Sequence, residues 1–368
     1  MAATGGYGFG IVGLGMIAEF HAKAIQAMEG GHLACAYSRN GGEKAEKFAS
    51  AFGVRVYTGD FEPFLRDPRL QVVAIATPSG AHLEPAAAAA SAKRHVLCEK
   101  PLDVTLERCD RMIAACKRNR VLLGGIFPSR TGGAVNALKQ ALNAKRCGRL
   151  TVCNALIPWH RPQSYYDSVA WRGTWKLDGG GALMNQSIHT LDLLQWLAGP
   201  VKELSAYAGC QIHQRIEVED AAVAAVKYKS GALGIIAGST AMWPGNAAEI
   251  HISGEKGSAW LRGGNLIQWQ FDPEAPGDAE VRERFKPAPE GPAKGGASDP
   301  RAISFTGHQR QFENFVRCLD GKEKLLVDGA EARKAVEIIL AMYASALARK
   351  AVKFPLQRTP KLKKFSKA

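Results

Sequence analysis

Short apolar runs alternate with segments of helical periodicity along the first third of the chain. The runs have the length of buried strands, and the segments between them repeat apolar residues at helical spacing. Strands that alternate with helices imply right-handed crossovers, so the pattern predicts an α/β fold with a parallel, doubly wound sheet. The predicted strands are residues 9–12, 33–37, 54–57, 72–76, 96–98 and 121–126, and the predicted helices are residues 16–28, 43–52, 84–93 and 106–118.

Strands dominate the pattern in the second half of the chain. Two pairs of apolar runs each flank a short turn that contains glycine, which is typical of β-hairpins, and this block predicts an open, mostly antiparallel or mixed sheet. Residues 272–300 are rich in proline, glycine and charge, so we expect a long exposed loop there. The predicted strands are residues 150–157, 221–228, 232–237, 249–253 and 258–261, and the predicted helices are residues 133–145, 183–197, 307–319 and 329–348.

The length of 368 residues favours two domains over a single core, and the change of pattern divides them into residues 1–126 and 127–368. Hydrophobic residues make up 46% of the chain and charged residues 22%, as in soluble globular proteins. No apolar run approaches the ~18 residues that cross a bilayer, and the first residues lack the regions of a signal peptide. We therefore expect a cytoplasmic protein without a membrane partner.

The eight cysteines show neither a C-x-x-C motif nor the spacing of zinc ligands. Most of them lie in apolar runs, so we interpret them as small buried hydrophobic residues in a reducing compartment. The sequence therefore predicts no metal site.

The formal net charge is +14, and eight lysines and arginines fall within residues 349–368. We expect this basic tail to be solvated and frayed. Nucleic-acid binding is the alternative, and it is disfavoured because no nucleic-acid motif accompanies the charge. A positive field would also attract an anionic cofactor or substrate.

A glycine turn follows the first predicted strand and opens the first predicted helix. In this order of strand, turn and helix, the G-x-G-x-x-A pattern is typical of dinucleotide binding, because the pyrophosphate approaches a helix N-terminus. The alternative is a glycine-rich loop without a ligand. The predicted cofactor-binding residues of the turn are Gly13, Leu14, Gly15, Met16 and Ile17.

The end of the second predicted strand bears on the choice of cofactor. NAD-preferring sites usually place an acid there to hold the ribose 2′-hydroxyl, but no acid lies between His32 and Gly42. Ser38 and Arg39 occupy the position, and an arginine can pair with a 2′-phosphate. We therefore predict NADP, with the alternative that Arg39 faces solvent and either cofactor is accepted.

Polar residues follow two further predicted strands directly. Glu99, Lys100 and a proline end one strand, and Thr77, Pro78 and His82 follow the other. Ligands of an open α/β sheet lie outside the carboxyl ends of its strands, so we expect these residues to face the cofactor. The alternative for Lys100 is a surface lysine that closes a strand.

Aromatic and arginine side chains are interleaved between residues 159 and 175. Flat aromatic faces suit sugar rings, and the guanidinium group suits hydroxyls, carboxylates or phosphates. The alternative is a loop that packs its own aromatic residues. The predicted substrate-binding residues are Trp159, Arg161, Tyr166, Trp171 and Arg172.

A run of three glycines precedes a predicted helix that carries Asn185 and His189. These two residues are four positions apart, so they share one face of a helix. A lone histidine on such a helix is more often structural. A histidine one turn from an amide and close to a glycine run is the better catalytic candidate.

Together these segments resemble the Gfo/Idh/MocA family of NAD(P)-dependent oxidoreductases over nearly the whole chain. The motifs that carry the resemblance are residues 10–15, 76–82, 95–101 and 171–173, and the glycine run with Asn185, His189 and Asp192. The resemblance implies an NAD(P)-binding Rossmann domain followed by an α/β domain for substrate binding and oligomerisation. The open sheet of that second domain commonly forms an interface in relatives, so we expect a homodimer or homotetramer.

The resemblance also implies roles for individual residues. Lys100 matches the catalytic lysine of the family, and His189 matches its histidine. Asn185 stands where polyol and sugar dehydrogenases often carry aspartate. An aspartate would stabilise an imidazolium, whereas an asparagine can only orient the ring, so we expect Lys100 to be the principal acid/base.

The function that we expect is reversible oxidation of a secondary hydroxyl on a sugar, sugar derivative or cyclitol. Hydride would move to or from nicotinamide C4 while Lys100 exchanges the hydroxyl proton. A redox-assisted glycosidase with tightly held cofactor is one alternative on the same fold. A non-catalytic dinucleotide-binding regulator is another, and the presence of Lys100 and His189 argues against it.

Overall fold

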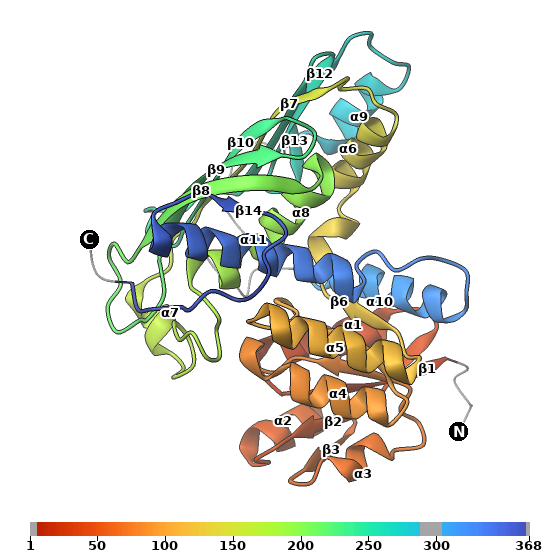
Figure 1. The fold of residues 1–368 in the computed structure, drawn as a ribbon. Coiled ribbons are helices and arrows are strands. Elements are labelled where there is room, and N and C mark those ends of the chain that lie inside the picture. The colour runs from red at the N-terminus through yellow and green to blue at the C-terminus, as the bar shows by residue number, and fades with distance from the viewer. Residues whose placement is uncertain (1–5, 288–303, 366–368) are drawn as a thin grey trace. The chain divides into compact units, whose positions relative to one another are not determined.

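The computed structural model of the protein describes residues 6–287 and 304–365. Contacts group the chain into two compact units, each made of two segments. Unit 1 comprises Met1–Pro128 and Ser304–Arg333, and unit 2 comprises Ser129–Ile303 and Lys334–Ala368 (Figure 1). The division into functional domains at residue 126 stays a prediction, and the contacts add the returning segment Ser304–Arg333 to the first compact unit.

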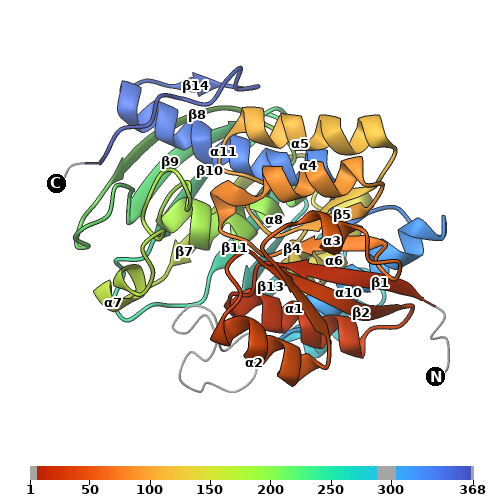
Figure 2. The same cartoon turned by 90° about the horizontal axis from the view of Figure 1, so that it is seen from below.

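Unit 1 is built on a six-stranded parallel sheet with the order β3-β2-β1-β4-β5-β6. Its strands are β1 (Tyr7–Val12), β2 (Gly31–Ser38), β3 (Arg55–Thr58), β4 (Val72–Ile75), β5 (His95–Cys98) and β6 (Leu123–Gly125). Its helices are α1 (Met16–Ala27), α2 (Glu43–Phe52), α3 (Glu62–Leu65), α4 (Leu83–Ser91), α5 (Leu106–Asn119) and α10 (Thr306–Leu319). Figure 2 shows α1, α2 and α10 on one face of the sheet and α4 and α5 on the other. The predicted doubly wound parallel sheet is confirmed.

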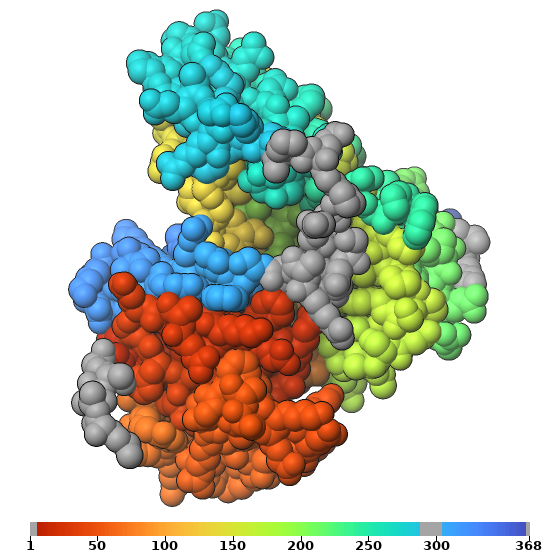
Figure 3. Space-filling view, turned by 180° about the vertical axis from the view of Figure 1, so that it is seen from behind, coloured from red at the N-terminus to blue at the C-terminus, as the bar shows by residue number. Residues whose placement is uncertain are grey.

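Helix α10 completes the core of unit 1, although it follows β6 by about half the length of the chain. Phe312 stacks on Phe9 with their ring centroids 5.8 Å apart, and Phe315 and Val316 are buried in the same cluster. The side chain of Gln311 accepts a hydrogen bond from the backbone N–H of residue 127 and donates one to the carbonyl oxygen of residue 125. Figure 3 shows this segment, in blue, against the N-terminal part of the chain, in red.

Unit 2 is built on an eight-stranded sheet with the order β13-β12-β11-β7-β10-β9-β8-β14. The pair β7–β10 is parallel and the other neighbouring strands are antiparallel, so the predicted mixed sheet is confirmed. Its strands are β7 (Leu150–Pro158), β8 (Val201–Gly209), β9 (Ala221–Tyr228), β10 (Leu233–Ser239), β11 (Glu249–Gly254), β12 (Gly257–Arg262), β13 (Asn265–Phe271) and β14 (Val352–Lys353).

The helices of unit 2 lie along one face of this sheet (Figure 1). Buried and exposed residues therefore alternate along the strands, as β9 shows most regularly. The opposite face carries exposed apolar side chains. The helices are α6 (Gly133–Asn143), α7 (Gln163–Asp167), α8 (Ile188–Ala198), α9 (Asp278–Phe285) and α11 (Gly329–Ala348), and a π-helix (Ala182–Ser187) precedes α8. Residues 329–333 of α11 are grouped with unit 1.

The expectation of a long exposed loop over residues 272–300 is wrong for its first part, which contains α9. The carboxylate of Asp278 is buried and accepts hydrogen bonds from the guanidinium of Arg146, at 2.7 and 2.6 Å, and from the indole N–H of Trp269, at 2.6 Å. These bonds hold the start of the helix against β13. Residues 288–300 lie outside the described residues.

The expectation of a frayed basic tail is also wrong as far as residue 365. Val352 and Lys353 form β14 against β8. Phe365 is buried, with its ring centroid 5.8 Å from that of Trp175 and 6.1 Å from that of Tyr343. Phe365 therefore packs the tail on unit 2, while Lys361, Lys363 and Lys364 before it stay exposed.

The cysteines behave as the composition predicts. All eight are free thiols, and seven of them are buried. In the part of the chain that the structure describes, no helix is both long and apolar enough to cross a membrane.

Candidate active site

The glycine turn between β1 and α1 has the backbone geometry that dinucleotide binding requires. Gly13 has a φ of +91°, and a Cβ at this position would lie 2.9 Å from the carbonyl oxygen of Ala76, so glycine is needed for the turn itself. Gly15 is exposed, and a Cβ added to it would meet no atom within 4 Å. Gly15 is also the N-cap of α1, and no side chain caps the helix. The N–H groups of Met16 and Ile17 are thus available to a pyrophosphate, whereas that of Ala18 donates to the carbonyl oxygen of Gly15, at 3.0 Å.

Replacing Gly15 by valine should abolish cofactor binding without unfolding the protein. The side chain has room in the cofactor-free protein, but it would occupy the space that a pyrophosphate needs. Calorimetric titration with NAD⁺ and NADP⁺ measures the loss, and thermal unfolding measures the fold. Gly13→Ala is the matched control, because it should lower thermal stability through its positive φ. Unchanged affinity in a folded Gly15→Val variant would show that the turn holds no cofactor.

The other residues of the turn and the end of β2 are placed differently. Leu14 and Ile17 pack against the core of unit 1, and Met16 is exposed. Ser38 is the last residue of β2 and is half-buried, whereas Arg39 is exposed. Within the described part of the chain, the guanidinium of Arg39 makes no hydrogen bond or ion pair.

The ends of β4 and β5 are fastened to each other by His82. Its imidazole is buried, with Nδ1 2.9 Å from the carbonyl oxygen of Pro101 and Nε2 3.0 Å from that of Thr77. His82 therefore acts on the site through the two loops that it joins. Pro78, which precedes the short turn of residues 79–81 between Thr77 and His82, is half-buried.

A buried carboxylate ties the same two loops a second time. Asp103 accepts hydrogen bonds from the backbone N–H of Leu83, at 3.1 Å, and from Nε of Arg108, at 2.7 Å. The guanidinium of Arg108 also donates to the carbonyl oxygen of Gly80, at 3.1 Å. Asp103 and Arg108 were not among the predicted site residues, although the acid lies only three positions after Lys100.

Glu99 and Lys100 follow β5 and differ in burial. Lys100 is half-buried, whereas Glu99 is buried. One oxygen of the Glu99 carboxylate accepts a hydrogen bond from the backbone N–H of Lys100, at 3.0 Å, and the other lies 2.8 Å from Nε2 of His21. Unit 1 thus gathers the predicted cofactor residues at the carboxyl ends of β1, β2, β4 and β5.

In unit 2, Asn185 and His189 lie where a π-helix passes into α8. Between Ala182 and Ala198 only these two residues and Trp196 are not buried, so Asn185 and His189 are the polar side chains of this stretch that remain accessible. The hydroxyl of Ser187 donates to the carbonyl oxygen of Ala182, at 2.8 Å, within the wider turn. Short π-helical turns are frequent at functional sites.

Asp178 supplies a carboxylate beside Asn185. Its Oδ1 accepts a hydrogen bond from Nδ2 of Asn185, at 2.5 Å, and its Oδ2 accepts one from the backbone N–H of Gly173, at 2.9 Å. The amide oxygen of Asn185 in turn accepts from Nε2 of Gln186, at 3.1 Å. Sequence reasoning missed Asp178, although it directly precedes the glycine run.

The aromatic and arginine segment partly surrounds this pair. The guanidinium of Arg172 lies 4.1 Å from the ring centroid of Tyr165 and 5.8 Å from that of Trp171. The hydroxyl of Tyr165 accepts from Nε2 of Gln186, at 2.7 Å, and lies 3.4 Å from the amide oxygen of Asn185. The sequence analysis selected Tyr166, yet the hydroxyl that reaches the Asn185 amide belongs to Tyr165.

Two of the predicted substrate-binding residues are buried in the structure. Tyr166 packs its ring 4.6 Å from that of His213 and shares a hydrogen bond with the hydroxyl of Thr240, at 2.8 Å. Arg161 donates to Oε1 of Gln186, at 3.0 Å, with its guanidinium 5.1 Å from the ring centroid of half-buried Trp159. Because Tyr166 and Arg161 are buried, they position the segment, whereas Trp159, Trp171 and Arg172 are half-buried and remain accessible.

Glu219 holds the glycine run that precedes Asn185. Its buried carboxylate accepts hydrogen bonds from the backbone N–H of Leu183, at 2.8 Å, and of Gly181, at 3.1 Å. Burial raises the pKa of Glu219 to about 7, although these hydrogen bonds favour the anion. The position of Asn185 therefore depends on a carboxylate that is only marginally ionised near neutral pH.

Stability should fall as the pH rises from about 4.5 to about 7, because the folded state keeps a proton on Glu219 that the unfolded state loses. Below this range both states are protonated, and above it the full cost of about 3 kcal/mol is present. Urea unfolding at about pH 5 and about pH 7.5 measures the change. In Glu219→Gln the difference between the two pH values should be smaller by about 2.4 kcal/mol, because the unfolded state is already partly ionised at about pH 5. Equal differences in both proteins would contradict the assignment.

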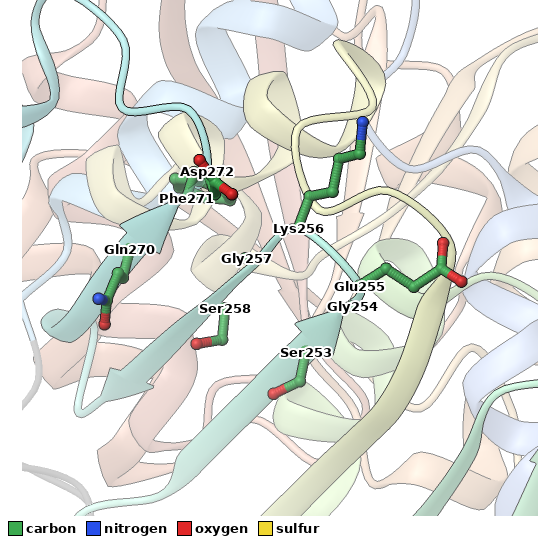
Figure 4. A pocket seen from close by; sticks show the side chains of 9 residues that line it. All are labelled: Ser253, Gly254, Glu255, Lys256, Gly257, Ser258, Gln270, Phe271 and Asp272. Atoms are coloured by element: carbon green, nitrogen blue, oxygen red, sulfur yellow. The ribbon is translucent and has the colours of Figure 1, made fainter.

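A surface hollow lies away from these residues, where the turn between β11 and β12 meets the end of β13. Figure 4 shows that the side chains of Lys256 and Glu255 point in different directions instead of converging on a common point. Glu255 is also paired with Arg149 across the turn. None of the predicted site residues lines this hollow.

Comparison with known proteins agrees with the two-part architecture. Residues 7–126 match a family model described as an oxidoreductase family with an NAD-binding Rossmann fold, and residues 135–260 match the GFO/IDH/MocA C-terminal domain. The chain belongs to the Gfo/Idh/MocA family of oxidoreductases. The resemblance that the motifs suggest is thus confirmed.

Curated members of the Gfo/Idh/MocA family are similar over much of the chain. Myo-inositol 2-dehydrogenase of Thermotoga maritima is 29% identical over 254 residues, which are 67% of this chain and 73% of that protein. Levoglucosan dehydrogenase of Pseudarthrobacter phenanthrenivorans is 28% identical over 241 residues, 59% of this chain and 61% of that protein. The chain is therefore an NAD(P)-dependent oxidoreductase with sugar and cyclitol dehydrogenases among its relatives.

One solved structure of the Gfo/Idh/MocA family matches nearly the complete chain. The WlbA dehydrogenase from Bordetella pertussis, in complex with NADH and UDP-GlcNAcA, has a TM-score of 0.86 and 32% sequence identity. The match covers 96% of this chain and 99% of the WlbA chain.

Proposed function

We propose that the protein oxidises a secondary hydroxyl on the sugar of a nucleotide-linked sugar acid. The observation that carries this proposal is the similarity to the WlbA dehydrogenase bound to NADH and UDP-GlcNAcA, at 32% identity over 96% of the chain. The general class, a sugar oxidoreductase, does not depend on that single relative. The substrate is what the proposal adds.

The charge of the protein supports an anionic substrate. The net charge is +14, and the guanidinium of Arg172 lies within the aromatic segment beside Asn185. Arginine pairs with carboxylate and phosphate through parallel hydrogen bonds. A nucleotide-linked sugar acid carries both groups, whereas myo-inositol carries neither.

The roles proposed for the side chains follow from their placement in each unit. When bound, the cofactor accepts hydride at nicotinamide C4. In unit 1, Lys100 takes the proton of the reacting hydroxyl. In unit 2, Asn185 is oriented by Asp178 and Gln186, and it presents its amide with His189 to the sugar. The hydrogen bonds made by His82, Asp103 and Arg108 fix the loop that carries Lys100.

A substrate panel tests the proposal. The purified protein is mixed with NAD⁺ or NADP⁺ and with UDP-GlcNAcA, UDP-GlcNAc, myo-inositol or levoglucosan, and the absorbance of reduced nicotinamide is followed. We expect the highest kcat/KM for UDP-GlcNAcA, and a loss of at least about tenfold for UDP-GlcNAc, which lacks the carboxylate. Highest activity on myo-inositol would contradict the nucleotide-linked substrate. Release of UDP without net cofactor reduction would favour the glycosidase alternative.

We propose that NADP is preferred over NAD, because Arg39 follows β2 in an exposed position without a carboxylate beside it. Arg39→Ala should therefore raise the dissociation constant of NADP⁺ by about tenfold and leave that of NAD⁺ within about threefold. Calorimetric titration with both cofactors measures the effect. Equal losses for the two cofactors would show that Arg39 does not bind the 2′-phosphate.

We further propose that the protein is a homo-oligomer that associates through the sheet of unit 2. The face opposite the helices exposes Tyr207 of β8 by 78%, and Leu233 and Ile235 of β10 by 57% and 47%; these two strands flank β9. An apolar patch of this kind marks an interaction surface. Light scattering after size exclusion should give a mass of at least twice 39.5 kDa, and a monomer would contradict the proposal.

A further inference from the structure

Three buried side chains from distant parts of the chain meet at the carboxyl end of β5. His21 comes from α1, Glu99 follows β5, and His308 comes from the first turn of α10. Nε2 of His21 lies 2.8 Å from Oε1 of Glu99, and Nε2 of His308 lies 3.6 Å from the same oxygen. The centroids of the two imidazole rings are 5.6 Å apart, and that of His21 lies 5.3 Å from the ring centroid of Phe312. The cluster is entirely within unit 1.

The hydrogen bonds indicate which groups in this cluster are charged. Nδ1 of His21 and Nδ1 of His308 are buried and make no hydrogen bond within the described part of the chain. A protonated imidazole would leave a buried N–H donor unsatisfied at each of these atoms, which is costly. Two neutral imidazoles avoid this cost, because His21 can donate its Nε2–H to the carboxylate, while Nε2 of His308 faces the same oxygen at 3.6 Å.

The pKa shifts agree with this assignment. Burial lowers the pKa of His21 and outweighs the opposing effect of its hydrogen bond to Glu99. Burial alone would raise the pKa of Glu99, but the hydrogen bond from His21 and the nearby imidazole of His308 bring it well below its usual range. Glu99 is thus a buried anion, and in the described part of unit 1 no lysine or arginine forms an ion pair with it.

A buried anion without a permanent cation favours a ligand that brings positive charge. The oxidised nicotinamide ring carries one positive charge and the reduced ring carries none. Glu99 lies at the carboxyl end of a central strand, where an open α/β sheet binds its ligand. We propose that Glu99, held as a carboxylate by His21 and His308, is an electrostatic positioning residue. Its negative charge makes the protein bind the oxidised nicotinamide cofactor more tightly than it would without that charge. This inference rests on the proposed use of NAD(P).

The same three side chains also form a donor set that zinc could accept. The structure argues against a resident metal. Metal-bound histidines usually donate their second ring N–H to an acceptor, whereas Nδ1 of both histidines makes no hydrogen bond within the described residues. The separation of 2.8 Å between Nε2 of His21 and Oε1 of Glu99 is that of a direct hydrogen bond.

Glu99→Gln in the full-length protein tests the inference, because it keeps the shape of the side chain and removes its charge. Dissociation constants of the oxidised and reduced forms of the cofactor are measured by calorimetry. We expect the constant for the oxidised form to rise about tenfold, as a single charge interaction across a protein interior supplies, and that for the reduced form to change by less than about threefold. Glu29→Gln, an exposed acid between α1 and the amino end of β2, is the matched control and should leave both constants unchanged.

The outcomes separate this inference from the proposed function. If the wild-type protein binds neither cofactor form, the proposed function fails. If Glu99→Gln folds and binds both cofactor forms more weakly by the same factor, or binds both as the wild type does, the inference fails while the proposed function stands. One zinc ion per chain in the wild-type protein, lost in Glu99→Gln, would also overturn it. If Glu99→Gln does not fold, His308→Leu removes one donor and should shift the same ratio in the same direction, and an unchanged ratio would overturn the inference.

Discussion

Replacing Lys100 by methionine should lower turnover by at least ~10²-fold while the cofactor still binds. Lys100 follows β5 directly, and the backbone around it is fixed by Glu99, His82 and Asp103. Methionine keeps the length of the side chain and removes the ammonium group. Positioned acid–base catalysis is typically worth ~10²–10⁴-fold in rate, and this contribution should be lost. Single-turnover hydride transfer, measured across pH, reports the chemical step.

Two further variants show whether the lost group is an acid/base. Lys100→Arg should not restore turnover, because a guanidinium does not release its proton near neutral pH. His189→Ala should cost less than Lys100→Met, since Asn185 orients a ring without stabilising its cation. A larger loss in His189→Ala would reverse the two roles. Full activity in Lys100→Arg would leave Lys100 with a purely electrostatic role.

Replacing Asp192 by asparagine should lower the free energy of unfolding by about 3–5 kcal/mol. Asp192 lies on α8, less than one turn after His189, and its carboxylate is fully buried. It accepts two hydrogen bonds of 2.7 Å from Arg130, which is itself 1% exposed and lies 4.9 Å from the ring centroid of Trp196. Asparagine would leave this guanidinium buried without its anion. Urea unfolding with a constant m-value measures the loss.

The matched control for Asp192→Asn is Asp167→Asn, which breaks an exposed ion pair with Arg215 in the same unit. That variant should unfold close to the wild-type midpoint. The double variant Arg130→Met with Asp192→Leu should recover much of the stability lost in Asp192→Asn, because it removes both buried charges together. A loss of less than about 1 kcal/mol in Asp192→Asn would mean that water or another group compensates the arginine.

The periodicity of the sequence was sufficient to predict most of unit 1, because parallel strands buried on both faces appear as continuous apolar runs. The same reasoning located the glycine turn, whose open space at Gly15 is a local property of strand, turn and helix. Asn185 and His189 were also found locally. The prediction of their shared face assumed an α-helix, whereas the stretch begins as a π-helix.

The supporting residues could not be predicted in this way, because each acts through a partner far along the chain. Glu219 binds the backbone at residues 181 and 183, and His308 reaches a carboxylate more than two hundred positions earlier. Predictions from composition were wrong where a single residue anchors a segment that is otherwise polar and charged. Asp278 anchors a helix in a charge-rich stretch, and Phe365 anchors a basic tail. Neither anchor has a signal within its own segment.

The return of the chain to unit 1 at residue 304 makes unit 2 largely an insertion within unit 1. During synthesis, the core cluster around Phe9 and Ile25 stays incomplete until residue 316 has been added, because Phe312, Phe315 and Val316 belong to it. A nascent chain that stopped at residue 126 would contain every strand of the parallel sheet and still lack part of its core. The dinucleotide-binding half of this enzyme is therefore finished late, and a truncated protein that carries it alone would need residues 304–333 supplied through a short linker.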